Sequence, residues 1–246
     1  MTGLLAAEFL KLRTIRGTWG YLLTVVGLAG LVAAATIGSQ SQQERLGRNF
    51  QADLVTDAAG VTTFIALLFG ITLVTGEFRH GTITSALLAT PRRAVLLAAK
   101  LLAGSAAGVA LAALALLVVA TVAVVWLSLI DVPLELGEAG GPAGRILVAA
   151  LVAGAIGAAF GGVVHAQVPA LVGALIWLLV AEPLLGGLLS LLDIGVADYL
   201  PASAVFAISD PTSGGLAFLP AVGVGLAHLA GVTILAWLRT AHRDIT

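Results

Sequence analysis

The chain has 246 residues, of which 59% are hydrophobic and only 10% are charged, and its formal net charge is −1. Soluble domains usually carry about 25% charged residues, so this composition, with a mean hydropathy of +1.08, indicates an integral membrane protein. The lack of cysteine excludes disulfides, thiolate metal sites and cysteine nucleophiles.

Six apolar stretches are long enough to cross a bilayer, which takes about 20 helical residues at 1.5 Å each. They cover residues 18–38, 58–76, 95–130, 146–165, 168–189 and 216–238. The third is longer than one crossing needs, so we expect its first turns to project from the bilayer or the helix to tilt. The first is too long for a secretory signal and is followed by five more, so we expect it to be retained. The sequence thus predicts one all-α transmembrane domain over residues 1–246.

The basic residues are distributed unequally over the loops that these spans leave. If the N-terminus is cytoplasmic, nine of the 12 lysines and arginines fall on the cytoplasmic side and three on the outer side. The positive-inside rule therefore predicts that both termini are cytoplasmic. The excess of Arg over Lys, with much Ala, Gly, Leu and Val, is typical of a GC-rich bacterial genome, so we expect the bacterial cytoplasmic membrane.

The loop between the second and third spans, residues 76–93, reads GEFRHGTITSALLATPRR. Its central part, Thr82–Ala89, is compatible with a helix, Gly81 interrupts the chain before it, and Pro91 ends it. This pattern predicts a short helix set at an angle to the spans. An ordinary basic loop that fixes the topology is the alternative.

The same loop resembles the cytoplasmic segment of type-2 ATP-binding-cassette exporter permeases, whose second span ends with Glu, an aromatic residue, Arg, a variable residue, Gly and Thr. The matching residues are Glu77, Phe78, Arg79, Gly81 and Thr82, with His80 at the variable position. The resemblance covers most of the chain, including the polar outer loop after the first span. Residues 181–201, AEPLLGGLLSLLDIGVADYLP, resemble the fifth span and outer segment of this family, although an apolar match is less specific.

The resemblance implies that residues 77–93 contain a coupling helix, which docks in a groove of a separate ATPase subunit. Four side chains at helical spacing form a small ridge suited to such a groove; they are Ile83, Ala86, Leu87 and Thr90. The basic residues of the loop then pair with acids of the partner. Alternatively, Glu77 and Arg79 pair with local groups and stiffen the hinge at Gly81.

The chain itself contains no nucleotide-binding motif. A P-loop needs a lysine after glycine and before Ser or Thr, and neither Lys11 nor Lys100 stands in that context. We therefore expect no enzymatic activity and no cofactor in this chain. The resemblance implies two P-loop ATPase subunits, which bind ATP and Mg, and a second permease chain, identical or homologous. Membrane lipid is the remaining expected partner, and we expect no nucleic acid.

Glu182 and His228 are ionisable residues inside predicted spans. Glu182, in the fifth span before Pro183, costs roughly 2.5–3.5 kcal/mol at the bilayer centre, and Pro183 is expected to kink the helix. Glu182 lies on the translocation path or holds an outer gate; alternatively it caps or tethers a helix near the outer interface. We expect His228, in the sixth span, to donate a hydrogen bond between helices. No group of residues has metal-ligand spacing, so we predict no metal site.

Residues 188–210 are too apolar for a solvated loop and too interrupted to span. The resemblance implies short re-entrant helices in the outer leaflet, and a surface amphipathic stretch is the alternative. Glycine pairs four residues apart, Gly104 with Gly108 and Gly157 with Gly161, predict close helix packing.

A secondary transporter would need ion-coupling residues and usually inverted repeats. It remains an alternative to the exporter, as does a non-transporting sensor or immunity subunit. The substrate is not indicated.

Overall fold

The computed structural model describes residues 7–8, 10–11, 16–47, 50–90, 92–133, 136–210 and 215–241, and within these residues all regular secondary structure is helical. The elements are α2 (Arg16–Ser39), α3 (Gln42–Arg45), α4 (Phe50–Arg79), α5 (Thr82–Ala89), α6 (Arg93–Leu129), α7 (Leu136–Val164), α8 (Gln167–Ile176), the π-helical turn η1 (Trp177–Ala181), α9 (Glu182–Leu191), the 3-10 turn η2 (Ala197–Tyr199), α10 (Pro201–Ser209) and α11 (Phe218–Ala241).

Six helical stretches are long and apolar enough to cross a membrane, in agreement with the six predicted spans. They are Gly17–Ser39, Phe50–Arg79, Arg93–Leu129, Ala139–Val164, Gln167–Leu191 and Phe218–Arg239. The chain is therefore an all-α, multi-pass membrane protein.

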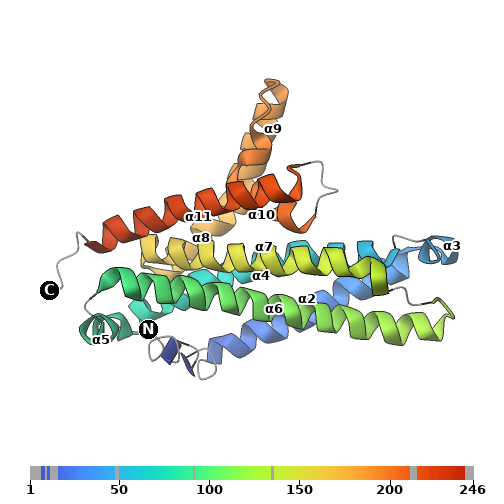
Figure 1. Ribbon diagram of the computed structural model, residues 1–246, viewed down its shortest axis with the longest axis horizontal. Helices are drawn as coiled ribbons and strands as arrows, with labels where there is room; N and C mark the ends of the chain where they lie inside the picture. Colours follow the sequence, from blue (N-terminus) through green and yellow to red (C-terminus); the bar gives the residue numbers. More distant parts are fainter. Residues whose placement is uncertain are drawn as a thin grey trace.

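Five long helices, α2, α4, α6, α7 and α11, run along the long axis of the molecule, as Figure 1 shows. The short helix α5 and the C-terminal end of α11 lie at one end, here called the α5 end. Helix α3 and the connection between α6 and α7 lie at the other, here called the α3 end. Helix α9 projects from the bundle at a steep angle to the other helices.

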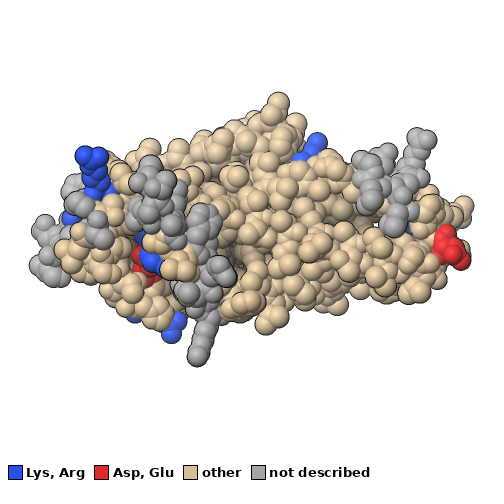
Figure 2. All heavy atoms as spheres, turned by 60° about the horizontal axis from the view of Figure 1, so that its bottom comes forward, with Lys and Arg blue, Asp and Glu red and all other residues tan. Residues whose placement is uncertain are grey.

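Charge is concentrated at the two ends of the bundle. In Figure 2, most visible Lys and Arg lie toward one end, with an acidic group among them, another acidic group lies at the far end, and the surface between shows little charge. Exposed acids at the α3 end include Glu44, Asp53 and Asp131, and exposed basic residues at the α5 end include Arg79 and Arg92. An uncharged belt between two charged ends is what a bilayer requires.

Helix α7 occupies the centre of the bundle and packs against α4 and α6. Glycine makes this close approach possible: a methyl group at Gly104 or Gly108 of α6, or at Gly157 or Gly161 of α7, would lie 2.1–2.9 Å from a carbonyl oxygen of the neighbouring helix. The predicted role of these glycine pairs in close helix packing is confirmed.

Two helices begin earlier than the hydropathy predicts. Helix α4 begins at Phe50 rather than residue 58, because its first turns are amphipathic: Phe50 and Leu54 are buried, while Asp53 and Asp57 are exposed. The amide of Gln51 donates to the carbonyl oxygen of Pro133, 2.8 Å away, and so holds this extension to the α6–α7 connection. Helix α7 begins at Leu136 rather than residue 146, with Pro142 in its early turns.

The fifth span is not one regular helix. The π-helical turn Trp177–Ala181 interrupts it, and Pro183 follows in the first turn of α9. Proline cannot donate a backbone hydrogen bond and its ring crowds the preceding turn, and sharp kinks in helices occur at prolines and at π-bulges. The kink expected at Pro183 is thus present, and α9 points away from the bundle (Figure 1).

The interrupted segment at residues 188–210 folds back onto the protein. Helix α10 packs against α4, α7 and α11, and most of its length is buried, including Ala204, Val205 and Ile208. This agrees with the short packed helices expected for a re-entrant segment. A surface amphipathic helix would leave one side of α10 exposed throughout.

Candidate functional site

The turn between α4 and α5 depends on Gly81. Helix α4 ends at Arg79, and Gly81 follows with φ +68°, the left-handed conformation that glycine adopts without strain. Helix α5 begins at the next residue, so the short helix predicted for Thr82–Ala89 is confirmed. It leaves α4 at an angle and lies at the end of the bundle (Figure 1).

Helix α5 exposes one side to the surroundings. Thr84, Ser85 and Leu88 are exposed, and Leu88 keeps 76% of its surface accessible. Ile83 and Ala86 are half-buried against α4 and α6. The side chain of Leu87 lies outside the described part of the structure. Which side of α5 contacts another protein therefore stays a prediction.

Glu77, five residues before the start of α5, is buried in a cluster of four charged side chains. The Lys11 ammonium donates to Glu77 Oε1 and to Glu8 Oε1, each 2.9 Å away. The Lys100 ammonium lies 2.5 Å from Glu77 Oε2, an ion pair without hydrogen-bond geometry, and 3.9 Å from Glu8 Oε1. We call Glu8, Lys11, Glu77 and Lys100 the ionic cluster.

The ionic cluster is electrically neutral, with two carboxylates and two ammonium groups. Glu8, Glu77 and Lys100 are buried, so their charges have given up most of their hydration, a cost that only close pairing offsets. Burial lowers the pKa of Lys11, but its hydrogen bonds to Glu8 and Glu77 and their negative charges outweigh this effect, and the pKa lies above its ordinary value. The cluster ties the N-terminal segment, the end of α4 and the first turns of α6 together.

No role in such a cluster was predicted for Glu8, Lys11 or Lys100 from the sequence. A signal was present, because Lys100 is a charged residue inside a predicted span and must be paired there. Glu77, at the end of the preceding span, was the nearest candidate with the opposite charge. The contribution of Glu8 required the position of the N-terminal segment, which hydropathy does not determine.

Phe78 and Arg79, the next two residues of the segment that resembles the permease family, contact the turn between α7 and α8. The ring of Phe78 meets that of His165 edge to face, with 4.4 Å between centroids, and Arg79 Nη1 donates to Gln167 Oε1 at 3.1 Å. His165 has φ 63° and lies at the turn between α7 and α8. Of the two roles considered for Glu77 and Arg79, the structure displays the local pairing. His80 is exposed, and Thr82 Oγ1 lies 3.5 Å from the carbonyl oxygen of Glu77.

Glu182 forms a second buried polar site. Its Oε1 accepts from the backbone N–H and the hydroxyl of Ser203, at 2.6 and 3.0 Å, and its Oε2 accepts from the Ala202 N–H at 3.0 Å and from Trp177 Nε1 at 2.6 Å. Ala202 and Ser203 belong to the first turn of α10, whose free N–H groups favour a carboxylate. Glu182 therefore caps α10 from α9, which matches the capping alternative for this residue.

The π-helical turn explains why Trp177 reaches Glu182. In an α-helix, residues five apart point to different sides, whereas a π-turn places residues i and i+5 close together. Pro183 follows directly and fixes the start of α9. His228 Nδ1 lies 3.0 Å from the carbonyl oxygen of Val224 in the same helix. The hydrogen bond expected between helices is not seen among the described residues and stays a prediction.

The described residues contain no group of three or more His, Asp and Glu side chains that could hold a metal ion. The fold and its charge distribution define the class, a polytopic α-helical membrane protein with a short exposed helix at one end. No protein-family model matches the chain, and no curated protein matches it.

Proposed function

We propose that this chain is the membrane-spanning permease subunit of a bacterial ATP-binding-cassette exporter. Separate P-loop ATPase subunits bind ATP and Mg, and a second permease chain, identical or homologous, completes the translocation pathway. The protein lies in the cytoplasmic membrane with both termini inside. The observation that carries this proposal is α5, a short exposed helix held at the end of the bundle between two of its long helices.

The position of α5 supports a coupling role. It follows α4 after one turn and is joined to α6 by only Thr90, residue 91 and Arg92. A force on α5 therefore acts on the ends of two membrane-spanning helices. The ionic cluster lies at the same level and links those ends through Glu77 and Lys100, so the two helices respond together rather than one at a time.

Charge supports the same orientation. Arg79, Arg92 and Arg239 are exposed at the α5 end, as the positive-inside rule requires of a cytoplasmic surface. The acidic α3 end then faces outward. An ATPase subunit is cytoplasmic, so α5 is on the side where such a partner is available.

Co-purification tests the proposal. The chain is tagged, expressed in its own host, extracted in mild detergent, and its bound proteins are identified. Leu88→Asp places a charge on the exposed side of α5, and Leu46→Asp is the matched control, since Leu46 is also exposed but lies at the α3 end. We expect a P-loop ATPase to accompany the wild type and Leu46→Asp, and to be lost from Leu88→Asp.

Three other results would contradict the proposal or part of it. If no ATPase accompanies the wild type, and the purified chain moves solute across liposomes without ATP, the secondary-transporter alternative replaces the proposal. If the ATPase binds but ATP drives no transport in liposomes containing both proteins, the chain is a sensor or immunity subunit. If Leu88→Asp retains the ATPase fully, α5 is not the docking element on that side.

A further inference from the structure

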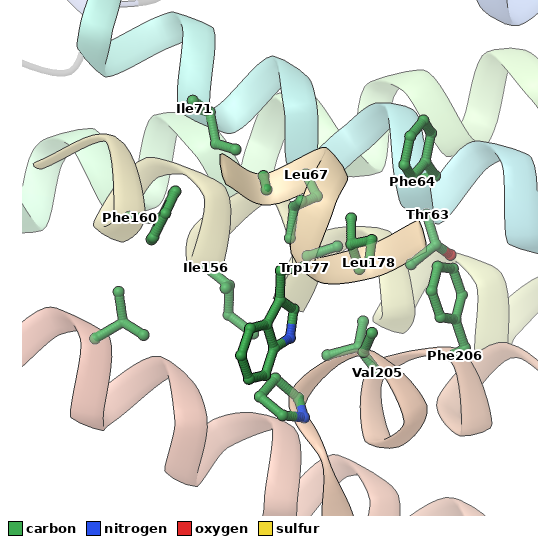
Figure 3. A pocket seen from close by; sticks show the side chains of 15 residues that line it. Thr63, Phe64, Leu67, Ile71, Ile156, Phe160, Trp177, Leu178, Val205 and Phe206 are labelled. Carbon is green, nitrogen blue, oxygen red and sulfur yellow. The ribbon is translucent and has the colours of Figure 1, made fainter. Parts of the chain in front are cut away.

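A cavity of about 210 Å³ lies among α4, α7, the α8–η1 segment, α10 and α11, and it is partly open to the outside. Its walls are formed largely by aromatic and branched aliphatic side chains, including Phe64, Leu67, Ile156, Phe160, Trp177 and Phe206 (Figure 3). Neither the ionic cluster nor α5 borders it.

The walls present almost no free hydrogen-bond donor or acceptor to a water molecule. The indole N–H of Trp177 and the backbone N–H of Ala202 are both taken by Glu182. The hydroxyl of Thr63 is buried in the wall without a hydrogen-bond partner among the described residues. A water molecule in a cavity needs two to four polar partners, and an apolar cavity of about 150 Å³ stays dry and accepts benzene. This cavity therefore suits hydrocarbon.

Two of the elements that line the cavity, the α8–η1 segment and α11, belong to spans whose outer surfaces are exposed to lipid. The α8–η1 segment belongs to the span Gln167–Leu191 and α11 to the span Phe218–Arg239, which are the two least buried of the six candidate spans, with 17% and 11% of their apolar windows buried. Ile176 and Leu179 on the first, and Ile234 on the second, are exposed. In a bilayer, the molecules next to these two walls are phospholipid acyl chains.

We propose that the cavity binds one acyl chain of a membrane phospholipid, which enters beside Trp177 and packs against Phe160 and Phe206. The inference does not depend on the proposed transport function. An acyl chain in this cavity contacts the indole ring of Trp177, whose N–H donates to Glu182. Glu182 in turn accepts from the N–H groups in the first turn of α10. Occupancy of the cavity thus supports the packing of α10 on the bundle.

A count of retained phospholipid tests this proposal. Ala174 is buried and lines the cavity, so Ala174→Leu fills part of it; Ala230→Leu adds the same side chain to an exposed position of α11 and is the matched control. Each protein is washed extensively in mild detergent, and bound phospholipid is counted by native mass spectrometry. We expect wild type and Ala230→Leu to retain a phospholipid that Ala174→Leu loses.

A second measurement leaves the cavity unchanged. Replacing Trp19, Trp126 and Trp237 with Phe leaves Trp177 as the only tryptophan. This variant is reconstituted with phospholipid brominated on its acyl chains, which quenches nearby tryptophan, and is then diluted into unlabelled lipid. A bound chain leaves part of the quenching in place after bulk lipid has exchanged. Complete and immediate recovery would overturn the proposal, even if Ala174→Leu fails to fold.

Two further outcomes count against the proposal. Wild-type protein without retained phospholipid contradicts it directly, as does equal retention by Ala174→Leu. If Ala174→Leu instead changes the ratio of monomer to dimer with no change in lipid, the cavity is covered by a second copy of the chain.

Discussion

Replacing Glu77 with Gln removes the carboxylate that the two ammonium groups of the ionic cluster share. In this variant Lys11 keeps its ion pair with Glu8 Oε1, 2.9 Å away, and its side chain is about one-third exposed. Water therefore compensates part of the lost interaction with Glu77. Lys100 has neither water nor a close second carboxylate to replace Glu77. Only 4% of its side chain is exposed, and the nearest remaining carboxylate oxygen, Glu8 Oε1, is 3.9 Å away. The cost therefore falls mainly on Lys100.

The expected magnitude follows from this geometry. Breaking a buried ion pair from one side costs about 3–5 kcal/mol, because an uncompensated charge stays buried. We expect Glu77→Gln to lower the free energy of unfolding by about this amount. Adding Lys100→Met removes the stranded ammonium and leaves Glu8 paired with Lys11, so the double variant is expected to regain most of the lost stability.

The assay is unfolding in mixed micelles followed by circular dichroism, with wild type, both single variants and the double variant forming a double-mutant cycle. Arg92→Gln is the control, since the Arg92 side chain is exposed at the same end of the bundle, and changes at such surface positions usually stay within about 0.5 kcal/mol. A cost below about 1 kcal/mol for Glu77→Gln, or a double variant no more stable than Glu77→Gln alone, would refute the reasoning.

Three other substitutions test the remaining features. Glu182→Gln turns an amide N–H₂ group toward one of the two pairs of donors that the carboxylate now accepts from. We expect the free energy of unfolding to fall by about 3 kcal/mol, because hydrogen bonds to a charged group contribute about 1.5–3 kcal/mol each. A variant as stable as the wild type in the same unfolding assay would contradict this. Gly157→Ala places a methyl 2.1 Å from the Leu67 carbonyl oxygen and should cost about 1–3 kcal/mol. Gly223→Ala, where a methyl meets nothing within 4 Å, should not destabilise the protein. The raised pKa of Lys11 means that its contribution is fully present below its unfolded pKa, about 10.4, and is lost as pH rises through the folded value. The stability difference between wild type and Lys11→Met should therefore be constant near neutral pH and shrink above pH of about 10; a difference that falls near neutral pH would argue against this pairing.

Hydropathy was sufficient to predict the six spans, and local residue chemistry was sufficient for α5. The Gly81 break and the helix that follows depend on neighbours along the chain, so they could be predicted without tertiary contacts. The glycine pairs were also readable, because close helix approach requires small residues at fixed spacing.

The polar sites were predicted less completely, since they join distant segments. Nothing near Glu182 in sequence reveals that its carboxylate caps a helix beginning at Pro201; that contact depends on the chain folding back after α9. The ionic cluster likewise joins residues 8, 77 and 100. The early starts of α4 and α7 escaped the hydropathy pattern because their first turns contain polar residues, glycine and proline; in α4, Gln51 donates to the carbonyl oxygen of Pro133 at the α3 end.

The length of α6 determines where the bilayer ends relative to these sites. A hydrocarbon core takes about 20 helical residues, and Trp126, exposed near the C-terminal end of α6, is of the type that anchors at a membrane interface. Counting back from Trp126 leaves residues 93–105, about 20 Å of helix, standing clear of the hydrocarbon on the α5 side. Lys100 and its carboxylate partners then lie level with the lipid headgroups or beyond them, where the protein, and not the lipid, keeps them dry. Ions and other solutes in the solution on the α5 side can consequently reach the margin of this cluster without crossing any part of the membrane.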